Sequence, residues 1–401
     1  MIGRRSAGAV GAAFSTAALV WLLTILNTPA QSRIQMPTVE RLEGARWWPT
    51  KDSAARADYV GPAACASCHR AKAESQARTA MARTATRAAE SEVLGARPLL
   101  TFVTAPYRHT ITTKSGTSIY SVSDGDRTAT AVLGWAFGMG RVGQTFLFER
   151  DGTLYETRAS YFGALDALHF TPGRTLDAPR TVDDAMARPL VRSEARRCVG
   201  CHTTASSVSG VLSLAGMTPG VTCEACHGPG RAHVEAMREH REDDGLAAIV
   251  NPAGFGPIDS VDFCGACHAT YWDVILAGQK GIAALRSQPF RLQSSRCWGE
   301  GDRRITCVAC HDPHAPLEHD ASVYAVRCLA CHMQAGLPGE SAPGAPTRTR
   351  SEAVAPQAPA CRANATGQCA TCHMPKYAAP EMHFTFTDHL IRVVRNPGAA
   401  H

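Results

Sequence analysis

The chain has 401 residues, of which 45% are hydrophobic and only 6% aromatic, and it contains 34 glycines and 24 prolines. This length excludes a small secreted module held together by disulfides alone, and so few aromatic residues give a thin conventional core. The formal net charge is +6 and there are 16 cysteines, so the fold must account for an unusual number of thiols.

The N-terminus has the organisation of an export signal. A basic segment, MIGRR, precedes the apolar run SAGAVGAAFSTAALVWLLTIL, and small residues follow near Ala30. This order is typical of a signal peptide of the general secretory route, cleaved after Ala30. Because the run approaches transmembrane length, an uncleaved membrane anchor is the alternative. We expect residues 1–33 to be one or the other, and residues 34–60 to be an extended linker.

The pattern Cys-x-x-Cys-His is the most informative feature, because it occurs seven times and uses all but two of the cysteines. It is the attachment sequence of c-type haem, in which the thiols bond to the porphyrin and the histidine is the proximal iron ligand. Zinc ribbons and disulfide frameworks do not need a histidine after every second cysteine. We therefore predict seven covalently attached haem c groups. The motif residues are Cys65, Cys68 and His69; Cys198, Cys201 and His202; Cys223, Cys226 and His227; Cys264, Cys267 and His268; Cys307, Cys310 and His311; Cys328, Cys331 and His332; and Cys369, Cys372 and His373.

The motifs divide the chain into haem-binding segments and a β-rich insert. Residues 61–95 hold the first motif and an Ala/Arg/Lys-rich helix. Residues 96–178 contain alternating β-branched and aromatic runs separated by KSG, DGD and RDG, which predict an antiparallel meander. Residues 179–335 crowd haems two to six together, residues 336–360 form a Pro/Ala-rich loop, and residues 361–401 carry haem seven and a ligand-donating tail.

These segments predict the fold class of a multihaem cytochrome c. We expect short helices and loops wrapped around seven haems, with a β-rich antiparallel insert after the first haem. The porphyrins are large apolar bodies that replace much of a conventional core. Two propionates on each haem offset the basic residues, so the positive formal charge is no argument for a nucleic-acid partner.

Seven six-coordinate irons would need seven ligands beyond the motif histidines, and nine histidines lie outside the motifs. Three of these are left out, because His240 and His319 stand in charged stretches and His401 is terminal. The predicted distal ligands are His109, His169, His233, His314, His383 and His389.

Two of these candidates follow a motif closely, in CEACHGPGRAHV and CHDPH. A haem blocks the few residues after its own motif from reaching the far face of its iron. We therefore expect His233 and His314 to bind the irons of neighbouring haems, which would bring the haems into contact.

Three further residues each have two possible roles. Met81 follows the first motif by one helix, and as an axial ligand it would raise that haem's potential; packing against a porphyrin is the other reading. Cys297 and Cys361 lie outside the motifs. They either form a disulfide that ties the last segment to the fifth haem or remain free thiols.

Several longer stretches resemble the hydroxylamine-oxidoreductase-like, or doubled-CxxCH, superfamily of multihaem c-type cytochromes. They are YVGPAACASCH, LGWAFGMGRVGQTFLFERDGTLYE, VTCEACHGPGRAHV, ITCVACHDPH, CATCHMPK and FTDHL. The resemblance implies bis-histidine haems, with His233, His314 and His389 at recurrent distal positions and His383 matching less closely. The chain departs at Met81, where many relatives have histidine.

The favoured function is electron transfer by an exported, periplasmic or outward-facing cytochrome, with no catalytic residue. Its partners would be redox proteins, such as a quinol dehydrogenase, other cytochromes or a terminal reductase, together with the cytochrome c maturation machinery. The alternative is a multihaem oxidoreductase that acts on a small nitrogen or sulfur compound at one five-coordinate haem. A haem-based sensor is the third reading.

Overall fold

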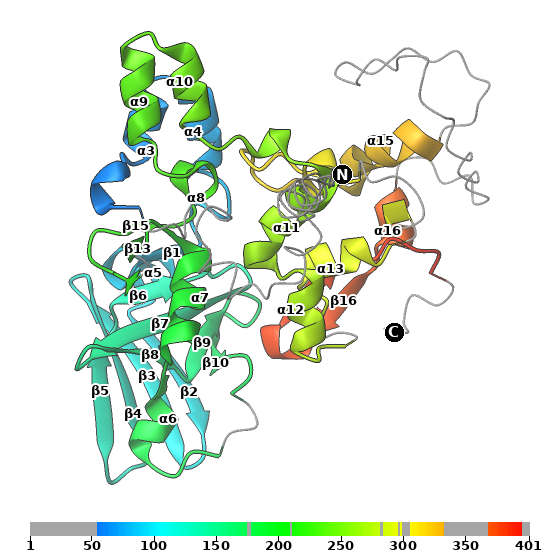
Figure 1. Cartoon of the computed structure of the whole chain (residues 1–401). Helices are drawn as coiled ribbons and strands as arrows, with labels where there is room; N and C mark the ends of the chain where they lie inside the picture. Colours follow the sequence, from blue (N-terminus) through cyan, green and yellow to red (C-terminus); the bar gives the residue numbers. More distant parts are fainter. Residues whose placement is uncertain are drawn as a thin grey trace, which may run out of the picture.

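The computed structural model describes residues 54–174, 178–208, 211–280, 284–295, 297–298, 305–332 and 368–394. The predicted signal or anchor, most of the linker, the Pro/Ala-rich loop, Cys361 and His401 lie outside these residues, so the predicted disulfide to Cys297 stays a prediction. Within the described residues, no helix has both the length and the apolar character to span a membrane. A β-rich half lies on the left of Figure 1, and a helical half lies on the right.

The β-rich half consists of two antiparallel sheets. A four-stranded sheet has the order β2 (Leu99–Thr104), β3 (Tyr107–Lys114), β4 (Thr117–Ser123) and β5 (Thr128–Val132). A seven-stranded sheet runs through β1 (Ala85–Arg87), β6 (Trp135–Phe137), β7 (Gly143–Arg150), β8 (Thr153–Thr157) and β11 (Ala187–Pro189). In the same sheet β9 (Ala159–Phe162) pairs with β7 and with β10 (Ala167–Phe170).

Buried and exposed side chains alternate along the strands, and the buried faces of the two sheets share one core. Ile111, Tyr120 and Phe146 are fully buried in one apolar cluster, and the helix α6 (Val182–Met186) adds Met186 to it. The turns are those that the sequence predicted: Ser115 and Gly116, between β3 and β4, both have positive φ. This is the conformation of a two-residue turn with primed geometry.

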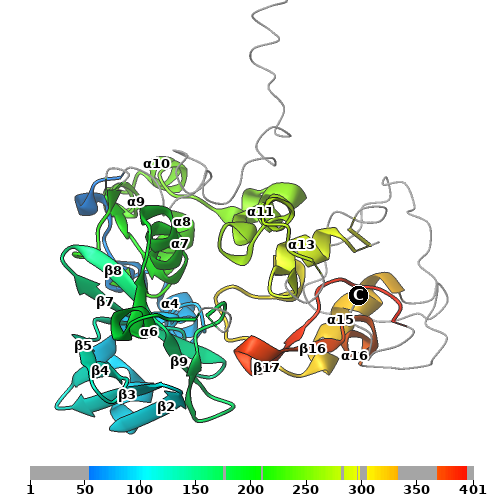
Figure 2. The ribbon, with the colours of Figure 1, turned by 90° about the horizontal axis from the view of Figure 1, so that it is seen from below.

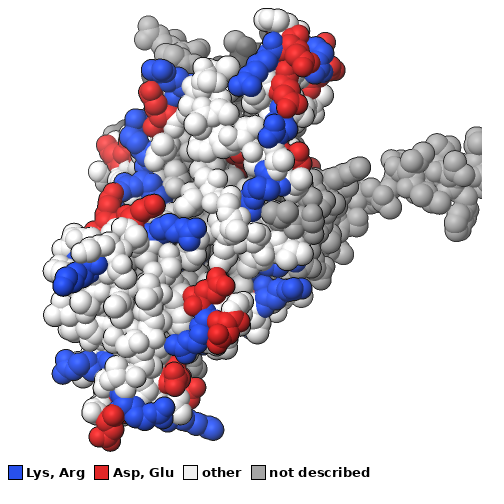
Figure 3. Space-filling view, turned by 90° about the vertical axis from the view of Figure 1, so that its left-hand side faces the viewer, with Lys and Arg blue, Asp and Glu red and all other residues white. Residues whose placement is uncertain are grey.

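The predicted meander is present, but the β unit is larger than the run of predicted strands. The stretch TLYETRASYF, predicted as one strand, is divided at Arg158 into β8 and β9. The short strands β1 and β11 come from outside residues 96–178 and join the same sheet. On the face in Figure 3, acidic and basic side chains are interspersed.

Short helices make up most of the remaining described chain. Around the first three motifs these are η3 (Arg56–Asp58), α3 (Pro62–Ala66), α4 (Arg70–Gln76), η4 (Ala88–Glu90), α5 (Glu92–Ala96), α7 (Arg192–His202), α8 (Cys223–His227), α9 (Arg231–Arg238), α10 (Glu242–Ala247) and η5 (Pro252–Gly254). The later ones are α11 (Pro257–His268), α12 (Tyr271–Leu276), α13 (Gln288–Gln293), α14 (Cys307–Cys310), α15 (Ala321–His332), α16 (Cys369–His373) and η8 (Pro380–Met382). Three strand pairs complete the described fold: β12 (Thr203–Thr204) with β15 (Thr218–Pro219), β13 (Ser207–Val208) with β14 (Val211–Leu212), and β16 (Lys376–Ala379) with β17 (Phe384–Thr387).

The helices α11 to α16 and the hairpin β16–β17 form a lobe beside the β-rich half, as the view from below shows (Figure 2). In six of the seven motifs both cysteines lie on one helix, and five of these helices end at the motif histidine. A helical turn brings residues three apart to the same side, which is the placement that two thiols need to reach one porphyrin edge.

His109 lies in the core of the β unit. Its side chain is 0% exposed, its Nδ1 lies 2.7 Å from the Tyr120 hydroxyl, and its ring packs against Phe102. The sequence shows why: His109 alternates with Tyr107 and Ile111 on the inward face of β3. Its predicted role as a distal ligand stays a prediction.

We predict that His109 makes the β unit less stable in acid. Burial, followed by the charge of Arg158, lowers its pKa from 6.5 to about 4. The unfolded chain therefore binds the proton first, so stability that is complete above pH 6.5 is lost as the pH falls through 4, by roughly 3 kcal/mol. Urea unfolding of the holoprotein followed by far-UV circular dichroism should show this loss, and His109→Gln should flatten it. An unchanged slope in the variant would contradict the prediction.

Candidate haem sites

Three motif histidines each face a histidine from a distant part of the chain. The rings of His69 and His233 have centroids 6.4 Å apart and planes inclined by 20°. His227 and His314 are related in the same way, at 6.0 Å and 13°. The third pair is formed by His311 and His389, at 6.2 Å and 41°.

This spacing fits one iron between each pair of rings. A bond from a metal to a histidine nitrogen is about 2.0 Å long, and the ring centroid lies roughly 1 Å beyond that nitrogen. Two imidazoles on opposite sides of one iron therefore have centroids about 6 Å apart. The observed distances of 6.0 to 6.4 Å fall at this value.

The orientation of the imidazoles also suits metal binding through Nε2. The Nδ1 atom of His227 lies 2.8 Å from the carbonyl of Val250, and that of His233 lies 2.8 Å from the carbonyl of Gly245. A carbonyl only accepts, so Nδ1 carries the proton and Nε2 presents a lone pair. In the same way, Nδ1 lies next to a backbone carbonyl in three further histidines: His202 next to Thr84, His373 next to Arg392 and His389 next to Thr387.

Two of the facing histidines are kept neutral by their surroundings. Burial lowers the pKa of His311. Burial and then the neighbouring His311 lower the pKa of His389 to about 4. Neutral imidazole is the form that binds a metal.

Cysteines of different motifs touch one another, which shows that the attachment sites adjoin. Cys65 of the first motif hydrogen-bonds to Cys223 of the third. The other such pairs are Cys264 with Cys307, and Cys328 with Cys369. The thiol of Cys201 lies 3.7 Å from the carbonyl oxygen of Ala266, inside the fourth motif. The motifs thus meet edge to edge although up to 158 residues separate them in sequence.

The first motif faces a histidine. The segment GPG follows α8, and α9 then places His233 opposite His69. Met81 lies in a loop, where its carbonyl accepts a hydrogen bond from the N–H of Val221 at 2.9 Å. The two predicted roles of Met81, as an axial ligand or as a residue packed against a porphyrin, stay predictions.

His169 and His383 lie together at the contact between β10 and the C-terminal hairpin. Their centroids are 4.7 Å apart and their planes are inclined by 82°, and Phe102 and Phe162 pack beside them. This distance is too short for an iron between the two rings. As ligands they would have to serve two different irons, so their assignment stays a prediction.

A buried ion pair fixes the tail segment that presents His389. Asp388 is 0% exposed and accepts two hydrogen bonds from Arg291 on α13, at 2.8 and 2.6 Å, and one from Arg392 at 2.6 Å. Burial alone would raise the pKa of Asp388, but hydrogen bonds from Arg291, the N–H of Leu390 and Arg392 lower it overall. The carboxylate thus anchors the distal ligand of the fifth motif to α13.

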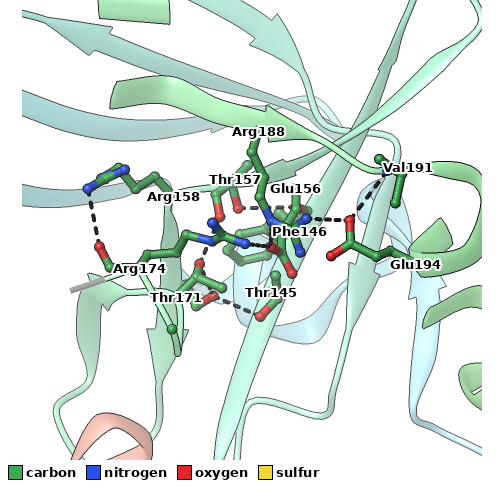
Figure 4. A network of polar contacts seen from close by, with 12 residues as sticks. Thr145, Phe146, Glu156, Thr157, Arg158, Thr171, Arg174, Arg188, Val191 and Glu194 are labelled. Carbon is green, nitrogen blue, oxygen red and sulfur yellow. Dashed lines mark hydrogen bonds and ion pairs between the residues drawn. The ribbon is translucent and has the colours of Figure 1, made fainter. Parts of the chain in front are cut away.

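A second polar network joins the β unit to the helix of the second motif (Figure 4). Glu156 on β8 accepts a hydrogen bond from Arg188 at 2.9 Å, and Arg188 donates a second one to Glu194 at 2.6 Å. Glu194 lies on α7 one turn before Cys198. Arg158, Arg174, Arg180 and Arg188 line a cavity of about 410 Å³ at this junction.

The structure brings His233, His314 and His389 face to face with the motif histidines His69, His227 and His311. Their role as distal ligands, and the ligands of the other four motifs, stay predictions.

One comparison with known proteins gives a match. A family model described as cytochrome c554 and c-prime matches residues 169–228. This segment runs from β10 through the motifs on α7 and α8, and it supports a c-type cytochrome with covalently bound haem c. No curated protein and no solved structure shows significant similarity to the chain.

We predict that His389→Ala converts one iron from six- to five-coordinate. Removal of the imidazole opposite His311 leaves that iron without its distal ligand, while the other irons keep theirs. Electron paramagnetic resonance (EPR) of the oxidised protein should gain a high-spin ferric signal equal to one iron per molecule. His240→Asn, at an exposed position with positive φ that asparagine tolerates, is the control and should gain none. A wild-type spectrum in the His389 variant would show that His389 binds no iron.

Asp388→Ala should destabilise the tail far more than loss of a surface ion pair. The substitution leaves Arg291 buried without its carboxylate, which costs roughly 3–5 kcal/mol. Asp244→Asn removes the exposed pair with Arg241, which water screens, and should leave the urea midpoint close to that of wild type. Urea midpoints of the two holoproteins give the comparison, and equal midpoints would refute it.

Proposed function

We propose that this protein is an exported c-type cytochrome that binds seven haems and transfers electrons between redox partners. The observation that carries the proposal is the set of three facing histidine pairs at 6.0 to 6.4 Å, each built from one motif and one distant segment. The family match to residues 169–228 supports covalent haem at two of the seven motifs. Because all seven motifs have the same Cys-x-x-Cys-His pattern, the proposal extends covalent haem to each of them.

Haem iron, when bound, cycles between the ferric and ferrous states and so supplies one-electron transfer. The chain's own contribution is to place its attachment sites in contact. The cysteine pairs Cys65–Cys223, Cys264–Cys307 and Cys328–Cys369 join motifs one and three, four and five, and six and seven. The contact of Cys201 with Ala266 adds a junction between motifs two and four. These junctions link motifs one and three, motifs two, four and five, and motifs six and seven, and adjoining sites of this kind favour electron transfer between haems over a set of isolated centres.

Two observations support export. c-Type cytochromes are typically exported, and the basic and apolar N-terminal residues have the pattern of a secretory signal or anchor. We propose a periplasmic or outward-facing location, with a membrane quinol dehydrogenase or another cytochrome as donor and a cytochrome or terminal reductase as acceptor.

A second candidate function is catalysis at one open iron. It is favoured by three motif histidines, those at 268, 332 and 373, for which the described residues supply no facing imidazole. A multihaem reductase or oxidase of small nitrogen or sulfur compounds would need one such position. Spin state separates the two functions, because an open ferric site is high-spin.

Intact-mass analysis and an EPR-monitored redox titration of the purified protein test the proposal. We expect a mass increment of seven haem groups and low-spin ferric signals only. A high-spin iron that reacts with nitrite or sulfite would favour the oxidoreductase. A protein of unmodified mass would refute both functions.

A further inference from the structure

The second residue of the third motif, Glu224, has a role that the haem-attachment pattern does not require. Its side chain is 2% exposed, and its carboxylate accepts three backbone hydrogen bonds. The donors are the N–H groups of Val60 at 2.9 Å, Gly61 at 2.8 Å and Gly230 at 2.8 Å. One side chain thus joins segments that lie more than 160 residues apart.

These three bonds fix both halves of the first iron site. Gly61 immediately precedes α3, which carries Cys65, and Gly230 immediately precedes α9, which carries His233. The ring of His233 faces His69 at 6.4 Å with planes inclined by 20°. The distance between the first motif and its distal ligand is therefore set from inside the third motif.

Glycine is favoured on both sides of the carboxylate, by backbone conformation at Gly61 and by close packing at Gly230. Gly61 has a φ of +78°, which a residue with a side chain rarely adopts. A Cβ at Gly230 would lie 3.0 Å from the Val60 side chain and 3.3 Å from Glu224 Oε1. This arrangement leaves the carboxylate little freedom to move.

The carboxylate also brings charge to the contact between two attachment sites. Backbone N–H groups stabilise a carboxylate without cancelling its charge. Glu224 is next to Cys223 in the third motif, and the side chain of Cys223 adjoins that of Cys65 in the first motif. The charge of Glu224 therefore lies beside the cysteines of the first and third motifs.

We propose that Glu224 is a positioning residue that aligns His233 with His69 and lowers the reduction potential of the irons held by motifs one and three. The inference rests on the proposed function, because it requires haem at these motifs. A buried negative charge favours the ferric over the ferrous state, so its removal raises the potential.

Glu224→Gln tests the charge at nearly constant shape, and Glu235→Gln is the matched control. Glu235 lies on α9, the helix of His233, and is 55% exposed in an ion pair with Arg231. In a potentiometric titration of holoprotein, Glu224→Gln should change the ferric-to-ferrous ratio of two haems at least tenfold at fixed potential, which is 59 mV for one electron. The other five haems and the control variant should match wild type.

Glu224→Asp tests positioning, because it keeps the charge and shortens the reach. It should leave the potentials low and shift the low-spin EPR signal of the pair His69–His233. If Glu224→Gln does not fold, haem peptide mapping should show haem lost from motifs one and three alone. Unchanged potentials in a variant with seven haems, or an equal shift at all seven, would overturn the inference and leave the proposed function intact. Absence of haem from wild type would instead refute the proposed function.

Discussion

Under the proposed function, the fold depends on one constraint: two neutral imidazoles must face each other across the width of one metal ion. Three pairs meet it, with centroids 6.0 to 6.4 Å apart. Backbone carbonyls at Nδ1 fix the tautomer in three members of these pairs, His227, His233 and His389, so that Nε2 is free to bind. Burial keeps His311 and His389 uncharged. Local hydrogen bonds and desolvation therefore both leave Nε2 unprotonated and able to bind a metal ion.

The facing partner always comes from another part of the chain, and this makes the haem region one interdependent body. His233 follows the third motif but faces the first, and His314 follows the fifth but faces the third. Buried carboxylates hold two of these long-range contacts: Glu224 for His233 and Asp388 for His389. Because metal ligation and folding are coupled, loss of one ligand weakens more than one site. The β unit joins this body through the network of Glu156, Arg188 and Glu194.

Much of this could be predicted from the sequence, because the informative features are local. The pattern Cys-x-x-Cys-His predicts the attachment residues, and the alternation of apolar and polar residues between turns predicts the strands β2 to β5. The short spacing of His233 and His314 after a motif predicts that each faces a different motif from the one it follows. The core position of His109 could also be read from the sequence, because His109 alternates with Tyr107 and Ile111 on one strand face. The role of Glu224 could not be predicted, because its three donors come together only in the folded chain. The hydrogen bond from the N–H of Val221 to the carbonyl of Met81 could not be predicted for the same reason.

The most direct test of this account is anomalous X-ray diffraction at the iron absorption edge from crystals of the mature protein. We expect an iron peak between the rings of each facing pair, His69 with His233, His227 with His314, and His311 with His389. We also expect seven peaks in total, each next to a motif histidine. Iron held by other residues, or facing rings with no iron between them, would contradict the account.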